Sequence, residues 1–189
     1  MPRLFVAVWP PAGVLDSIEA LDRPEVAGMR WTRRDHWHVT LRFLGSVPDV
    51  QPVTAALEAV APSVAAAEAV LGPAVERFGR RVLHVPVSGL DSVAAAVVAA
   101  TTVIGRPPDD RPFAGHVTLA RVSEKVSVDL RPLAGAPVEG RWPVTEVCLV
   151  RSDLSGPAPR YEVEAAFPLS GFVAPASGEG PPSAASEAP

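Results

Sequence analysis

Short apolar segments alternate with helix-like stretches along the chain. Segments rich in β-branched and aromatic residues, bounded by Pro or Gly, predict strands at 3–10, 37–45, 68–78, 81–88, 113–122, 144–152 and 160–169. Apolar positions at helical spacing predict helices at 11–22, 48–64 and 88–105. The strands on either side of Gly79 and Arg80 are expected to form a hairpin, and residues 123–139 are expected to be irregular.

The predicted element order, β-α-β-α-β-β-α-β-β-β, divides into two similar halves. Helices are too interleaved with strands for an all-β protein, and the hairpins argue against a purely parallel sheet. We therefore predict an α+β fold with two antiparallel sheets and helices on their outer faces. The domain is expected to span 1–172. The tail, 173–189, has no large apolar residue from Ala174 onward and is predicted to be disordered.

Composition and charge narrow the class of protein. Of the 189 residues, 48% are hydrophobic, which suffices for a core, yet no apolar run approaches the roughly 18 residues of a membrane-spanning helix. The N-terminal apolar run is too short for a signal peptide, so we expect a cytoplasmic protein. Cys148 is the only cysteine, which excludes an internal disulfide and a cysteine metal cluster. The net charge of −4 provides no global attraction for nucleic acid.

The tetrapeptide HVTL occurs twice, at residues 38–41 and 116–119, and uses two of the four histidines. We call each copy of this tetrapeptide an HVTL word. Side chains alternate along a strand, so His and Thr of each word face one way while Val and Leu face the other. If the two strands lie side by side, two imidazoles and two hydroxyls surround one cleft.

This set of side chains indicates a reaction class. Histidine donates and accepts protons near neutral pH, and threonine hydroxyls can bind anionic oxygens. A metal-free transfer or hydrolysis at a phosphate needs this combination. A zinc site made from His36, His38, His84 and His116 is a weaker alternative, because only the His-x-His pair has a spacing typical of zinc ligands.

The words and their flanks resemble a known family. RLFVAVWP, MRWTRRDHWHVTLRFLG, RPFAGHVTLAR and LVRSDLSGPAPRYEV, in that order, are similar to the RNA 2′,3′-cyclic phosphodiesterases, also called the 2′-5′ RNA ligase family, of the two-histidine phosphoesterase superfamily. The resemblance covers roughly residues 3 to 169. It implies a bilobal fold with pseudo-two-fold symmetry and a central cleft, and hydrolysis of RNA 2′,3′-cyclic phosphate ends to 2′-phosphates without metal or cofactor.

The resemblance also implies residue roles. His38 is expected to be the general acid, His116 the general base, and Thr40 and Thr118 phosphate ligands. Arg121 is a further phosphate ligand by resemblance, although simple alternation turns it away from His116 unless the strand bulges there.

Alternation places Arg42 on the face of His38, as a candidate RNA contact. Phe113 and Tyr161 are candidates for base stacking, and Ser152 for a substrate contact. Gly115 stands where the family usually has proline, and we expect it to loosen the backbone before His116. We expect His84 to be structural, and His36 to lie in a surface loop.

Other functions remain open. The same catalytic side chains also suit the hydrolysis of small cyclic nucleotides or of cyclic ADP-ribose phosphate. Reversible 2′-5′ RNA ligation is a related reaction. A non-catalytic RNA-end binding protein is the alternative from another class. The expected partners are RNA ends or small cyclic phosphates. No membrane and no obligate protein partner is inferred, so we expect a monomer.

Overall fold

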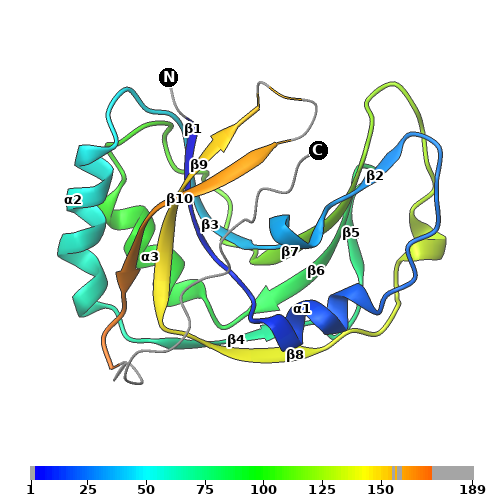
Figure 1. Ribbon diagram of the computed structural model, residues 1–189, viewed down its shortest axis with the longest axis horizontal. Helices are drawn as coiled ribbons and strands as arrows, with labels where there is room; N and C mark the ends of the chain where they lie inside the picture. Colours follow the sequence, from blue (N-terminus) through cyan, green and yellow to red (C-terminus); the bar gives the residue numbers. More distant parts are fainter. Residues whose placement is uncertain (1–2, 155, 157–158, 172–189) are drawn as a thin grey trace, which may run out of the picture.

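A computed structural model describes residues 3–154, 156 and 159–171 (Figure 1). The predicted tail, 173–189, lies outside the described residues. The strands are β1 (Arg3–Val8), β2 (Met29–Trp31), β3 (Val39–Ser46), β4 (Ala67–Leu71), β5 (Glu76–Phe78), β6 (Val82–Ser88), β7 (His116–Val122), β8 (Gly140–Val144), β9 (Glu146–Asp153) and β10 (Arg160–Pro168). The helices are α1 (Ala12–Glu19), α2 (Gln51–Val60) and α3 (Asp91–Ala100), and single 3-10 turns occur at Arg34–His36, Ala61–Ser63 and Arg131–Leu133.

All named strands pair antiparallel, in the order β10-β9-β1-β3-β7-β6-β4-β8, with β2 added beside β7 and β5 beside β6. The predicted α+β class with antiparallel sheets is confirmed. The two predicted sheets are continuous, because β3 and β7 pair at Val39 and Val117. The two HVTL words therefore meet at the middle of one curled sheet.

The two structural lobes do not coincide with the two halves of the sequence. The C-terminal strands β9 and β10 return to pair beside β1, so the first lobe contains β10, β9, β1 and β3. The second lobe contains β7, β6, β4 and β8, with β2 and β5 at its margins. The first lobe thus closes only after the second lobe has been completed along the chain.

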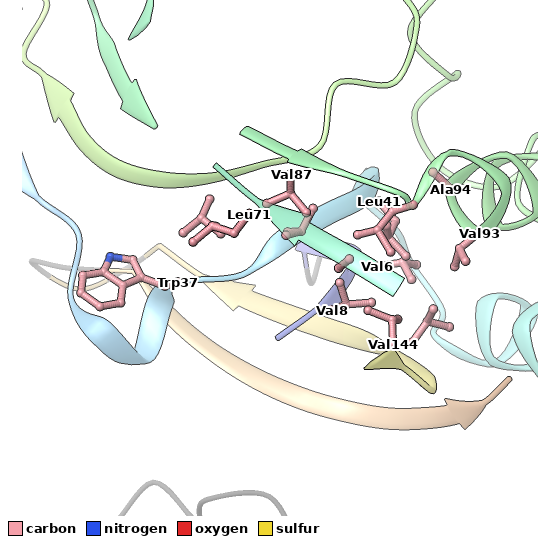
Figure 2. Close-up of a cluster of buried hydrophobic side chains, with 14 of the residues drawn as sticks. Val6, Val8, Trp37, Leu41, Leu71, Val87, Val93, Ala94 and Val144 are labelled. Atoms are coloured by element: carbon pink, nitrogen blue, oxygen red, sulfur yellow. The ribbon is translucent and has the colours of Figure 1, made fainter. Parts of the chain in front are cut away.

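The main core lies on one face of this sheet. Figure 2 shows part of it, where Val6 and Leu41 from the central strands pack near Val93 and Ala94 of α3. Helix α3 packs on β3 and on α2, and both helices lie together on one side of the molecule in Figure 1. Helix α1 contacts β8, where Gly140 permits close approach because a Cβ there would lie 2.9 Å from the Val14 side chain. These apolar contacts supply most of the stabilisation, since burial of apolar surface dominates folding.

The predicted strand at 68–78 is in fact two strands. Gly72 and Pro73 separate β4 from β5, and β5 pairs with β6 as the expected hairpin around Gly79. Strands β2 and β8 were not predicted. The first has only three residues, and the second contains Pro143, which a terminal strand of the sheet tolerates because its missing N–H is not needed there. In the described part of the chain, none of the helices has the length and apolar character needed to cross a bilayer.

Candidate active site

The two histidines and two threonines of the HVTL words lie around the Val39–Val117 pair. Both valines are fully buried on the core face. The adjacent residues point to the opposite face, and extending the antiparallel register by one residue sets His38 opposite Thr118 and Thr40 opposite His116. We call this side of the sheet the histidine face. All four side chains on it retain partial access to solvent, so the four-group arrangement expected from the repeat is present.

Both imidazoles are held by the same local hydrogen bond. Nδ1 of His38 lies 2.8 Å from the carbonyl oxygen of His36, and Nδ1 of His116 lies 2.8 Å from the carbonyl oxygen of Ala114. A carbonyl oxygen only accepts, so each Nδ1 carries the hydrogen. Each Nε2 is left to exchange protons with a ligand, which is the orientation that a pair of acid–base catalysts requires.

A bulge follows the threonine in each word, at the same position. In β3, Ala7 pairs with Thr40 and Val6 with Arg42, so Leu41 is the extra residue. In β7, His84 pairs with Thr118 and Leu83 with Ala120, so Leu119 is the extra residue. Each bulge reverses the alternation for the residues that follow it.

The bulge decides where the two candidate arginines lie. In β7 it brings Arg121 onto the histidine face, where its charge acts on both His38 and His116. Simple alternation would have turned Arg121 away from His116, and the bulge at Leu119 turns it toward His116 instead.

The equivalent bulge in β3 makes the expectation for Arg42 wrong. Arg42 is paired with Val6 of the core face, is 5% exposed, and donates to the carbonyl oxygens of Phe43, Arg106 and Pro107. It therefore has a structural environment, and Phe43 takes the position on the histidine face that Arg121 takes in the other lobe.

Aromatic rings surround His38. The ring of Phe5 stacks on it at 5.0 Å between centroids, Tyr161 meets it edge-on at 5.2 Å, and Trp9 lies at 5.3 Å. Phe5 belongs to a small buried cluster with Ala7, Cys148 and Val150 under the histidine face of the first lobe. Tyr161, a predicted stacking residue, thus lies at the site, where it also contacts the ring of His36.

His116 has a different environment. His84 is 2% exposed, and its ring lies 5.4 Å from that of His116, with Phe78 stacked on it at 3.7 Å. His84 was expected to be structural. It is buried, and it also adjoins the site.

Gly115 was expected to loosen the backbone before His116. The backbone is instead fixed there, because the carbonyl oxygen of Gly115 accepts a hydrogen bond from the N–H of Val87. A Cβ at Gly115 would clash with the Val87 carbonyl oxygen and lie 3.2 Å from the Phe113 ring. Only glycine therefore fits this close approach without a shift of neighbouring atoms.

Burial lowers the proton affinity of both histidines. The pKa of His38 is lowered to about 4, mainly by burial, with smaller contributions from His36, His116 and Arg121, and with opposition from its hydrogen bond to His36. The pKa of His116 is also lowered, by burial first and then by Arg121, against its hydrogen bond to Ala114. Both rings are neutral at pH 7 in the free protein, and an anion beside them would raise both pKa values.

Of the two remaining residues predicted to contact substrate, Ser152 lies on the histidine face and Phe113 packs against the core. Ser152 pairs with Tyr161 across β9 and β10 and, by alternation, shares the face of Val150 and Cys148. Phe113 packs against the main core and beside Gly115.

Phe43 and Phe78 also lie at the site, and neither was predicted there from the sequence. They are 53% and 42% exposed and lie beside the two histidine sites. Their exposure could have been found only by locating the bulge in β3 and the short strand β5.

Metal-ligating groups do not gather in the described part of the chain. No three side chains among His, Cys, Asp and Glu there are arranged to hold a metal ion. Cys148 is buried, and burial, assisted by Glu146, raises the pKa of its thiol to about 12, which keeps it protonated. The polar side chains that do gather on the histidine face carry imidazole, hydroxyl and guanidinium groups.

Comparison with known proteins identifies the family. The family model described as the 2′-5′ RNA ligase superfamily matches residues 9–156. A curated RNA 2′,3′-cyclic phosphodiesterase of Geobacillus stearothermophilus is 34% identical over 160 residues, which are 79% of this chain. The chain spans about half (51%) of the length of that relative.

Solved structures agree with the family model. A protein of Thermus thermophilus is 30% identical with a TM-score of 0.72, covering 88% of this chain and 97% of its own. E. coli LigT complexed with 3′-AMP is 26% identical with a TM-score of 0.69, covering 89% of this chain and 99% of its own. The family resemblance inferred from the paired HVTL words is confirmed, and the chain belongs to the 2′-5′ RNA ligase superfamily.

Proposed function

We propose that this chain hydrolyses RNA 2′,3′-cyclic phosphate ends to 2′-phosphates, with His38 and His116 as the acid–base pair and without a metal ion. The observation that carries the proposal is the matched orientation of the two imidazoles, each with Nδ1 bound to the carbonyl oxygen two residues earlier. The name of the Geobacillus stearothermophilus relative and the binding of 3′-AMP by E. coli LigT support a nucleotide phosphate as the ligand.

The proposed reaction uses the two histidines for two proton transfers. Nε2 of His116 removes a proton from water, and the oxygen of that water attacks the phosphorus. The bond from phosphorus to the 3′ oxygen breaks, and the proton on Nε2 of His38 passes to that leaving oxygen. The product carries a 2′-phosphate and a 3′-hydroxyl, and exchange with solvent restores the two histidines to their starting protonation states.

The threonines and Arg121 act on the phosphate rather than on the protons. Hydroxyls of Thr40 and Thr118 lie opposite the imidazole of the other word and can donate to the oxygens that do not react. Arg121, brought to this face by the bulge, supplies positive charge where negative charge develops on the phosphate. The negative charge of the bound phosphate raises the pKa of the His38 imidazole, so that the ring takes up from solvent the proton that it later donates.

The proposal is tested by product analysis. A short RNA with a 2′,3′-cyclic phosphate end is incubated with the protein, and the products are separated from synthetic 2′-phosphate and 3′-phosphate standards by chromatography. We expect the 2′-phosphate alone. Formation of the 3′-phosphate would contradict the choice of leaving oxygen, and tight RNA binding with persistence of the cyclic end would favour a binding protein.

A further inference from the structure

The two lobes present different surfaces at equivalent positions beside the catalytic pair. In the first lobe, a row of directly paired residues runs from Phe43 through Phe5 and Val150 to Val163. Every member is apolar, and the two ends are 53% and 48% exposed. A surface of this kind suits the face of a nucleobase.

The equivalent row of the second lobe runs from Phe78 through Val82 to Arg121 and Arg30, so it is basic at the end that lies toward β2. Arg121 occupies the position of Phe43, since each lies three residues after the threonine of its word. On its other side Arg121 pairs directly with Arg30 of β2. Directly paired residues of an antiparallel sheet point to the same face, so Arg30 and Arg121 project from neighbouring strands on the histidine face.

Arginine side chains bind phosphate oxygens well, and two of them on neighbouring strands can contact phosphates that are close together. The two arginines also line an open groove of about 410 Å³, together with Gly28, Met29, Val122 and Ser123. That volume falls within the range of small-molecule sites. The groove lies along β2 and the end of β7, and Arg121 belongs both to its lining and to the histidine face.

The neighbouring arginines of the β2–β3 connection are directed away from this groove. Arg33 pairs with Asp35 at 3.0 Å, and Arg34 bonds Asp16 and Glu19 of α1. Arg30 and Arg121 are the arginines that β2 and β7 present together on the histidine face. The protein carries a net charge of −4, so this basic pair is local rather than part of a general positive field.

We propose that Arg30 and the groove between β2 and β7 bind a second phosphate, the phosphodiester on the 5′ side of the reacting cyclic phosphate. This inference rests on the proposed function and names its substrate class as a dinucleotide or longer RNA. Arg121 holds the reacting phosphate, Arg30 holds the next one, and the base of the terminal nucleotide lies toward the apolar row of the first lobe. A mononucleoside cyclic phosphate leaves the groove empty.

The same chemistry, a second phosphate near the cyclic one, is present in ADP-ribose cyclic phosphate. The test therefore uses three substrates: adenosine 2′,3′-cyclic phosphate, the dinucleotide ApA ending in a 2′,3′-cyclic phosphate, and ADP-ribose 1″,2″-cyclic phosphate. The variant is Arg30→Gln. The matched control is Arg141→Gln, which removes an exposed arginine of β8 that pairs with Glu68 at 2.9 Å.

We expect Arg30→Gln to lower kcat/KM for the dinucleotide roughly tenfold, mainly through KM, as expected for one lost charge-assisted hydrogen bond. Turnover of the mononucleotide should change less than about twofold, and Arg141→Gln should resemble the wild type on both. The slope of log KM against log salt for the dinucleotide should fall by about 0.7, the contribution of one phosphate contact in a single strand. Equal effects of Arg30→Gln on mononucleotide and dinucleotide, or no effect on either, would overturn the inference. Loss confined to ADP-ribose cyclic phosphate would overturn RNA as the source of the second phosphate.

Failure of the proposed function is distinguishable from failure of this inference. Wild-type protein that turns over none of the three substrates would refute the phosphodiesterase activity. Calorimetric binding of ApA ending in a 2′-phosphate, compared with adenosine 2′-phosphate, still reports on Arg30 without turnover. Tighter binding of the dinucleotide that Arg30→Gln abolishes supports the second site, and equal binding of the two ligands by the wild type contradicts it.

Discussion

Val39 and Val117 face each other where β3 and β7 meet, and this pair brings the histidines of the two HVTL words to the same part of the sheet. Both valines are fully buried, so core packing fixes the backbone from which His38 and His116 project in the opposite direction. The symmetry of the site is therefore a consequence of packing on the other face of the sheet. Each histidine is further fixed by its own Nδ1 hydrogen bond.

Removal of either imidazole should nearly abolish turnover. We expect His38→Ala and His116→Ala each to lower kcat for RNA cyclic phosphate by about 10²–10⁴, the usual contribution of one acid or base. The double variant should be little slower than the slower single one, because groups that act as a unit are not additive. Stopped assays give the rates, and thermal unfolding verifies the fold. Rates near wild type in a folded single variant would contradict the assignment.

The pH dependence should reflect the lowered pKa values. One histidine must be charged and the other neutral, and burial lowers both pKa values below 6.5, that of His38 to about 4. The charged form of each therefore disappears as pH rises through its lowered pKa. We expect a bell-shaped kcat/KM profile centred below pH 6.5, whichever histidine is the acid.

The profile of kcat should be centred at higher pH than that of kcat/KM, because bound phosphate raises the pKa of both rings. Steady-state kinetics between pH 4 and 8 measure both profiles. A kcat/KM optimum above pH 7 would show that the histidines are not depressed in the free protein.

Arg42 and Arg121 should separate stability from catalysis. Arg42→Ala removes the donor from the part-buried carbonyl oxygens of Phe43 and Pro107 and should lower the free energy of unfolding by about 1–3 kcal/mol, while kcat of the folded protein stays within a few-fold of wild type. Arg121→Ala should lower kcat/KM by about 10²-fold with little change in stability. Urea unfolding and kinetics on both variants test the bulges, and the opposite pattern would mean that simple alternation holds.

Gly115→Ala should impair His116 without removing it. The added Cβ meets the Val87 carbonyl oxygen and the Phe113 ring, so the strand has to shift immediately before the catalytic imidazole. We expect roughly a tenfold loss of kcat, because small misplacements of a catalytic group are costly. Gly13→Ala is the control, since nothing lies within 4 Å of its new Cβ and alanine favours helix α1. Equal activity of both variants would show that the close approach at Gly115 does not position His116.

The sequence was sufficient to predict the fold class and to place the two HVTL histidines on one face of the sheet, because both depend on regular patterns. The duplicated HVTL word marks equivalent strands, and alternation places its polar residues on one face. The error at Arg42 and the uncertainty at Arg121 have a single cause. A bulge shifts the phase of a strand by one residue, and nothing in the words LRF or LAR marks Leu41 or Leu119 as the extra residue.

The lobe boundaries could not be predicted for a different reason. Which strand returns beside β1 depends on tertiary pairing, and β9 is separated from β1 by the whole second lobe. The role of Gly115 depends on its distance to Val87, a residue far from it in sequence. Local patterns contain no information on such long-range contacts.

The measurement that tests the central claim most directly is phosphorus NMR of a short RNA with a 2′,3′-cyclic phosphate end, incubated with the wild type and with His116→Ala in EDTA. We expect the cyclic signal to convert to a 2′-monophosphate with the wild type, unaffected by the chelator, and to persist with the variant. Persistence of the cyclic signal with the wild type, or activity that is lost in EDTA and restored by zinc, would contradict metal-free catalysis by the paired histidines.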